Sequence, residues 1–116
     1  MAGGLGRDGA AARLAASVAS YALGVPLADI LDRRRGSAEA AFARQVAMYL
    51  CHVAFELSLA RIALAFERDR STVAHACHVI EDRRDAPSFD TWIAALELML
   101  RDAPALSGAR RAGALL

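Results

Sequence analysis

Residues 58–76 constrain the fold of this chain more than any other segment. Apolar side chains recur at helical spacing up to Phe66, give way to the polar residues 67–70, and return at Val73. Two short helices joined by a tight polar turn form a helix-turn-helix, whose second helix can enter the major groove of DNA. The segment therefore predicts a helix-turn-helix and, through it, a DNA-binding function.

The rest of the chain favours helices as well. Its 116 residues suffice for one small domain, and 56% of them are apolar, with alanine prominent among these. Alanine favours helices strongly and fills little core volume. The sequence contains no run of alternating β-branched residues of the kind that predicts a strand. We therefore predict an all-α fold, a compact bundle of about six helices.

Helix-capping residues mark several boundaries. Ser37 and Ser58 are candidate N-caps, and Gly24 is a candidate helix stop. The helix after Ser37 is apolar on several faces, so we expect it to be the most buried. The predicted helices cover residues 11–23, 27–32, 38–56, 59–66, 71–84 and 89–101.

The two ends of the chain differ in composition from its middle. We expect residues 1–10, which are rich in glycine, to be a flexible N-terminus and residues 102–116 to be a disordered tail. Residues 11–101 then form the domain. The N-terminus lacks the pattern of a signal peptide, and no apolar stretch is long enough to cross a bilayer. We expect a cytoplasmic, nucleoid-associated protein with no membrane partner.

The sequence predicts burial or exposure for five further side chains. Cys51 and Cys77 lie within predicted helices without a Cys-x-x-Cys partner, which favours buried, reduced thiols. We expect Tyr21 on the apolar stripe of its helix and Met99 in the core. Arg84, near a helix end, is expected in solvent.

The charge of the chain gives only weak support for DNA binding. All fourteen basic residues are arginine, and the net charge is +1. Between Arg33 and Arg84 nine arginines accompany six acidic residues, a local excess of three. Each guanidinium can bind phosphate or guanine through two hydrogen bonds, so the chemistry of the cations suits DNA better than their number does.

The second helix of the helix-turn-helix has two different faces. Val73, Cys77 and Ile80 fall together and predict its core face. Solvated helix faces usually carry Glu, Lys or Gln, but the opposite face here carries Ser71, Thr72, His75, His78 and Asp82. We interpret this face as a contact surface and favour His75 as a base or phosphate contact, with a plain solvated histidine as the alternative. His78 is expected to be plain surface.

These residues resemble a known family. The motifs that carry the resemblance are Arg44-Gln45-Val46-Ala47-Met48-Tyr49-Leu50, Leu57-Ser58-Leu59, Ile62, Phe66, Arg68-Asp69, Thr72-Val73 and His75-Ala76. They are similar to the C-terminal DNA-binding domain of the chromosomal replication initiator DnaA, over about residues 14–100. The resemblance implies a Trp-repressor-like fold that binds an asymmetric DnaA box of the TTATCCACA type in double-stranded DNA.

The resemblance also implies which residues contact DNA. Arg35 in the basic loop matches an arginine that enters the minor groove, where narrow A·T-rich DNA concentrates negative potential. Arg44 and Gln45 match residues near the DNA backbone. The helix that Ser58 caps can offer its first amides to a phosphate. The full candidate set is Arg35, Arg44, Gln45, Ser58, Arg68, Asp69, Arg70, Ser71, Thr72 and His75.

Two residues of this set have specific expected roles. Thr72 can place its methyl group against a thymine methyl group. Asp69 is acidic at a DNA-facing position, and three roles stay open for it: capping the second helix, orienting Arg70, or accepting a hydrogen bond from cytosine.

The sequence departs from the family pattern at several positions. Arg70 replaces the usual His, and Ser71 replaces the first Thr. Ala63 replaces a Gly of the family pattern, and the single residue Glu67 replaces its Gly-Gly turn. These departures leave the preferred operator open. Fewer cations than the family pattern predict a shallower salt dependence, since each phosphate contact adds about −0.9 to its slope.

Other function classes have little support in the sequence. Without any lysine the chain cannot contain a Gly-x-x-x-x-Gly-Lys loop, so we expect a standalone domain without a nucleotide-binding motor. His75, His78 and the cysteines do not form a convincing metal or catalytic set. We expect no cofactor, no metal and no enzymatic activity. The alternative function is an interaction module that binds DnaA or a replication regulator and modulates initiation with little DNA affinity of its own. Whether initiation is activated or repressed stays open.

Overall fold

The computed structural model describes residues 2–34 and 36–102, and within these ranges it contains six helices and no strand. The helices are α1 (Ala2–Leu23), α2 (Leu27–Leu31), α3 (Ala38–Ala54), α4 (Leu59–Phe66), α5 (Arg70–Arg83) and α6 (Pro87–Arg101). The predicted all-α bundle of about six helices is confirmed. None of the six is both long and apolar enough to span a bilayer. The predicted disordered tail after Asp102 lies outside the described residues.

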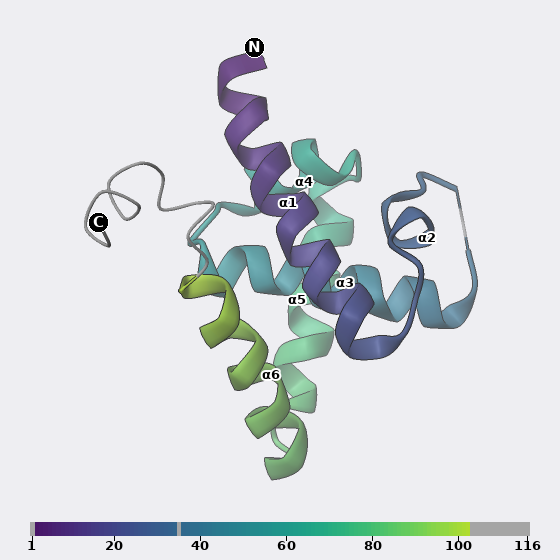
Figure 1. Ribbon diagram of the computed structural model, residues 1–116, viewed down its shortest axis with the longest axis vertical. Helices are drawn as coiled ribbons and strands as arrows, with labels where there is room; N and C mark the ends of the chain where they lie inside the picture. The colour runs from purple at the N-terminus through teal and green to yellow at the C-terminus, as the bar shows by residue number, and fades with distance from the viewer. Residues whose placement is uncertain (1, 35, 103–116) are drawn as a thin grey trace, which may run out of the picture.

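Helix α3 is the centre of the bundle (Figure 1). It contacts each of the other five helices, and nine of its residues are buried. Its N-cap is Ser37, as predicted. The Ser37 hydroxyl accepts a hydrogen bond of 3.1 Å from the backbone N–H of Ala40. The expectation that this helix is the most buried is confirmed.

Helix α1 begins at Ala2 instead of near Ala11, so residues 2–10 are helical where the sequence predicted a loose segment. Asp8 is only 7% exposed, and its carboxylate accepts two hydrogen bonds from Arg61 of α4, of 2.7 and 2.9 Å. These hydrogen bonds lower the pKa of Asp8 against the opposing effect of burial. The ion pair holds the first half of α1 against α4. Because Arg61 is far from Asp8 in the sequence, no local pattern predicts that these residues are helical.

The buried face of α1 consists of alanines. Ala11, Ala12, Ala15, Ala16 and Ala19 are all buried. Small side chains allow two helix axes to approach closely, and α1 packs extensively on α3. Tyr21 is 86% exposed, so its predicted place on the buried stripe is wrong. It follows Ala19 by two residues, about 200° around the helix, and therefore points away from the core.

The burial of two side chains in or near α6 differs from expectation. Met99 is exposed, not in the core. Arg84 is half-buried instead of solvated, because its guanidinium donates hydrogen bonds to the Asp90 carboxylate and the Tyr49 hydroxyl. The Tyr49 hydroxyl in turn donates a hydrogen bond of 2.6 Å to Glu81, and burial raises the pKa of Tyr49 to about 12. Helix α5 is thereby tied to α3 by polar as well as apolar contacts.

Both cysteines are free thiols. Cys51 is buried, as expected, whereas Cys77 is only half-buried. Burial raises the pKa of Cys51 to about 12 and that of Cys77 to about 11. Both side chains are therefore protonated near neutral pH and poorly reactive.

Candidate nucleic-acid interface

The predicted helix-turn-helix consists of α4, a turn at residues 67–69, and α5. Ser58 caps α4, as predicted, and accepts a hydrogen bond of 3.2 Å from the Arg61 N–H. At the other end of α4 the Arg68 N–H donates to the Ala63 carbonyl at 2.9 Å. Glu67 adopts the left-handed conformation, with φ 57° and ψ 49°, which this type of helix end requires.

The two faces of α5 lie as the sequence predicted. Val73, Ala76 and Ile80 are buried against the bundle, and Cys77 is half-buried beside them. The opposite face, with Ser71, His75, His78 and Asp82, points away from the core and is exposed. Thr72 beside this face and Arg70 in the first turn are exposed as well. The first turns of α5 are therefore exposed to solvent on this side.

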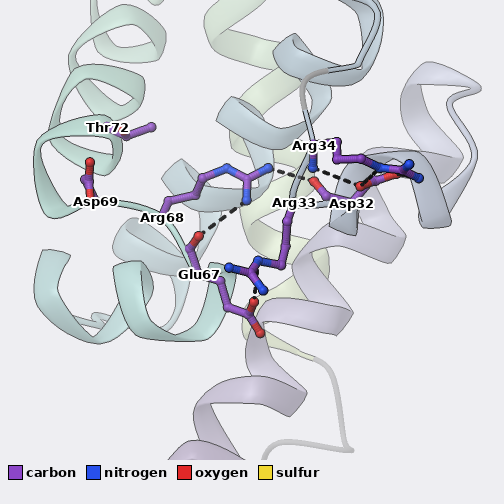
Figure 2. Close-up of a pocket in the computed structure, with 7 residues that line it drawn as sticks. All are labelled: Asp32, Arg33, Arg34, Glu67, Arg68, Asp69 and Thr72. Atoms are coloured by element: carbon purple, nitrogen blue, oxygen red, sulfur yellow. Dashed lines mark hydrogen bonds and ion pairs between the residues drawn. The ribbon is translucent and has the colours of Figure 1, made fainter.

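An open groove of about 670 Å³ lies beside the start of α5 (Figure 2). One wall comes from the end of α2 and the basic loop, and the other from the turn of the helix-turn-helix. Its lining residues are Asp32, Arg33, Arg34, Glu67, Arg68, Asp69 and Thr72. The fold thus brings part of the basic loop next to the first turn of α5. Arg35, the candidate minor-groove residue, lies outside the described residues.

Arg44, a predicted contact near the DNA backbone, lies mostly inside the fold. It is only 8% exposed. Its guanidinium donates hydrogen bonds to the carbonyls of Ile30 at 2.8 Å and Asp29 at 2.9 Å. The last carbonyls of a helix lack partners within it, so Arg44 stabilises the end of α2. Burial, with the nearby charge of Arg68, lowers the pKa of Arg44 from that of a free guanidinium.

Arg68 has a similar role on the other wall of the groove. Its guanidinium donates to the carbonyl of Asp32 at 2.7 Å and to that of Phe66 at 3.3 Å. Figure 2 shows the side chain extending from the turn across to Asp32. Arg68 is half-buried, and both of its Nη atoms are bound to backbone carbonyls of the protein itself.

The two described arginines of the basic loop are exposed but paired. Arg33 Nε lies 2.9 Å from Glu67 Oε1, and Arg34 Nη2 lies 3.3 Å from Asp32 Oδ2. The Arg34 backbone N–H also donates to Asp32 at 2.9 Å, and this bond, with the one from the Arg34 side chain, lowers the pKa of Asp32. The side chains of Arg33 and Arg34 are 76% and 87% exposed. Asp32 is not among the residues predicted for the site, although it stands just before three arginines in the sequence.

The remaining candidates occupy accessible or partly accessible positions. Ser58, Asp69, Arg70 and Ser71 are exposed, whereas Gln45 is half-buried. Asp69 occupies the N-cap position of α5, but its side chain makes no capping hydrogen bond. Its carboxylate is thus available at the mouth of the groove. Within residues 2–34 and 36–102 no group of three or more potential ligands could hold a metal ion.

Comparison with known proteins agrees with this geometry. Residues 12–80 match the family model described as the bacterial dnaA protein helix-turn-helix, a span that runs from α1 to near the end of α5. The chain belongs to the bacterial DnaA helix-turn-helix family. The resemblance of the motifs to this family is thereby confirmed.

Individual relatives of the DnaA family match over a limited part of their length. The chain is 41% identical over 83 residues to chromosomal replication initiator protein DnaA 2 of Chlamydia caviae, which covers 72% of this chain and 18% of that protein. It is 40% identical over 80 residues to chromosomal replication initiator protein DnaA of Laribacter hongkongensis, a match that covers 67% of this chain and 16% of that protein. The chain therefore corresponds to less than a fifth of these relatives.

Solved structures of DnaA-type proteins share the fold. A crystal structure titled DNA replication initiation factor superposes with a TM-score of 0.73 and 30% identity, over 83% of this chain and 30% of that one. The structure of replication initiator DnaA bound to AMPPCP and single-stranded DNA superposes with a TM-score of 0.71 and 29% identity. The match covers 82% of this chain and 29% of that one. The helical arrangement of the domain is thus that of DnaA.

Proposed function

We propose that the chain binds double-stranded DNA at sites like the DnaA box, and that it acts at the nucleoid in the control of replication initiation or transcription. The observation that carries the proposal is the exposed start of α5, where Arg70, Ser71, Thr72 and His75 project away from the core. Residues at the start of a recognition helix contact base edges in the major groove. Membership of the DnaA helix-turn-helix family supports the same function.

The proposal assigns separate roles to three parts of the surface. Thr72 contacts a thymine methyl group, and Arg70 takes either a guanine or a phosphate. The capped start of α4 at Ser58 offers backbone amides to a phosphate, with Gln45 as a further contact to the DNA backbone. Arg35 enters the minor groove, a role that rests on the sequence alone. We leave Arg44 out of the proposed interface because its guanidinium is bound to the carbonyls of Ile30 and Asp29 within the fold.

A second function has support from one observation. Three carboxylates, those of Asp32, Glu67 and Asp69, lie in the groove among its cations. A surface of mixed charge also suits a protein partner, such as DnaA itself or a replication regulator. We rank this function below DNA binding because the exposed face of α5 carries the residue types that contact bases.

Fluorescence anisotropy distinguishes the two functions. The protein is titrated into a labelled duplex with one TTATCCACA box and into a scrambled duplex, at several salt concentrations. We expect a preference for the box, an affinity that falls with salt, and a loss of about tenfold in Thr72→Ala and in Arg35→Ala. Equal, weak binding to both duplexes, together with stable association with purified DnaA, would instead support the second function.

A further inference from the structure

We propose that Glu67 is a built-in competitor for DNA phosphate, which holds Arg33 in the free protein and lowers the affinity of the groove for DNA. The inference rests on the proposed function and adds a residue that sets its strength. Arg33 Nε and Glu67 Oε1 are 2.9 Å apart, and both residues line the groove beside the start of α5 (Figure 2).

A carboxylate and a phosphate use the same donors of a guanidinium. Both accept hydrogen bonds from the planar fork of an arginine, so a phosphate that approaches the Nε edge of Arg33 competes with Glu67 for the same donor. When a DNA phosphate reaches Arg33, it must displace Glu67 or share the guanidinium with it. An exposed ion pair is weak, so the displacement is readily reversible.

The backbone keeps Glu67 beside the groove even when the pair breaks. Glu67 is the left-handed residue that ends α4, and the Arg68 N–H bond to Ala63 fixes this turn. Asp32 lies on the facing wall and is paired with Arg34. A phosphate that enters therefore meets a carboxylate on each wall, and Glu67 opposes binding mainly by competition for Arg33 and to a smaller extent by repulsion.

The competition changes the salt dependence of binding. A cation that is already neutralised by its own carboxylate releases fewer counterions from DNA when it binds a phosphate. Removing the Glu67 charge makes Arg33 a full phosphate contact, which steepens the salt slope by about 0.9. Affinity at low salt rises at the same time.

The test compares Glu67→Gln with Asp85→Asn. Gln keeps the size of Glu67 and remains a non-glycine residue in the turn. Asp85 is exposed at the far end of α5, about 20 Å along the helix, and its substitution removes the same unit of charge. Both variants are also made in an Arg33→Gln background, and thermal melting checks that all are folded.

We expect Glu67→Gln to tighten binding to the TTATCCACA duplex by about three- to tenfold at low salt and to steepen the slope, against less than about twofold for Asp85→Asn. In the Arg33→Gln background most of the gain disappears. If Glu67→Gln and Asp85→Asn behave alike, or the full gain persists without Arg33, the inference is wrong while box-specific binding by the wild type still upholds the proposed function. If no variant binds any duplex, both fail. Binding by Glu67→Gln alone supports both.

Discussion

Arg68 donates a hydrogen bond of 2.7 Å from Nη2 to the backbone carbonyl of Asp32, and so joins the helix-turn-helix to the end of α2. The two residues are 36 positions apart in the chain and form opposite walls of the groove. The same guanidinium also donates a hydrogen bond to the carbonyl of Phe66, the last residue of α4. Arg68 therefore sets the spacing between the basic loop and the start of α5.

Loss of this bridge should cost stability. We expect Arg68→Ala to lower the free energy of unfolding by about 1–2 kcal/mol, because charged hydrogen bonds to half-buried carbonyls are lost. Arg68→Lys keeps the charge but lacks the fork that reaches several carbonyls, so it should lose stability too. Urea denaturation followed by circular dichroism measures both. A lysine variant as stable as the wild type would show that charge alone matters at this position.

The Asp8–Arg61 pair predicts a pH dependence of stability. The pKa of Asp8 is lower in the folded chain than its ordinary value of 3.8, so the ionised carboxylate stabilises the fold above that pH. This contribution disappears as the pH falls through the lowered pKa. Asp8→Asn should therefore be less stable than the wild type at about pH 6, with the difference shrinking at about pH 3. Asp85→Asn, at an exposed site, is the control.

The backbone at Glu67 predicts a stabilising substitution. A left-handed conformation costs a non-glycine residue about 1–2 kcal/mol, whereas the greater freedom of glycine in the unfolded chain offsets about 0.5–1 kcal/mol of the gain. We expect Glu67→Gly to raise the free energy of unfolding by up to about 1 kcal/mol. Chemical denaturation tests this. A clear loss of stability would mean that the Arg33 pair contributes more than the strained backbone costs.

Local signals in the sequence were enough to predict most of the fold. Ser37 and Ser58 cap the helices that follow them, Gly24 ends α1 with φ 69°, and α4 has its predicted bounds. Such signals act within one helical turn, so they survive in the sequence without knowledge of the tertiary structure. The same holds for the outward face of α5, which follows from helical periodicity alone.

The site was harder to predict because every cation of the chain is arginine. Arg44 and Arg68 bind backbone carbonyls, Arg61 binds Asp8, and Arg33 binds Glu67. Nothing local in the sequence separates these from an arginine such as Arg70, which is exposed at the start of α5. Hydrogen-bond and ion-pair partners that lie far away in the sequence determine which arginine side chains remain free to bind a ligand.

The two histidines on the outer face of α5 provide a matched pair. His75 and His78 are both exposed and lie about one turn apart, but His75 is closer to the start of the helix. We expect His75→Ala to weaken binding to the TTATCCACA duplex by about tenfold, the effect of losing one base contact, and His78→Ala by less than about twofold. Anisotropy titration measures both. Equal effects would place the duplex differently along α5.

The most direct test of the account maps the duplex onto the protein by amide chemical shifts. The ¹⁵N-labelled chain is titrated with the TTATCCACA duplex and, separately, with the scrambled duplex. We predict shifts concentrated at residues 70–75, at Arg33 and Arg34, and at the first amides of α4 after Ser58, with the box giving the larger response. Shifts confined to α6, or none on the outer face of α5, would contradict the claim that this face binds DNA.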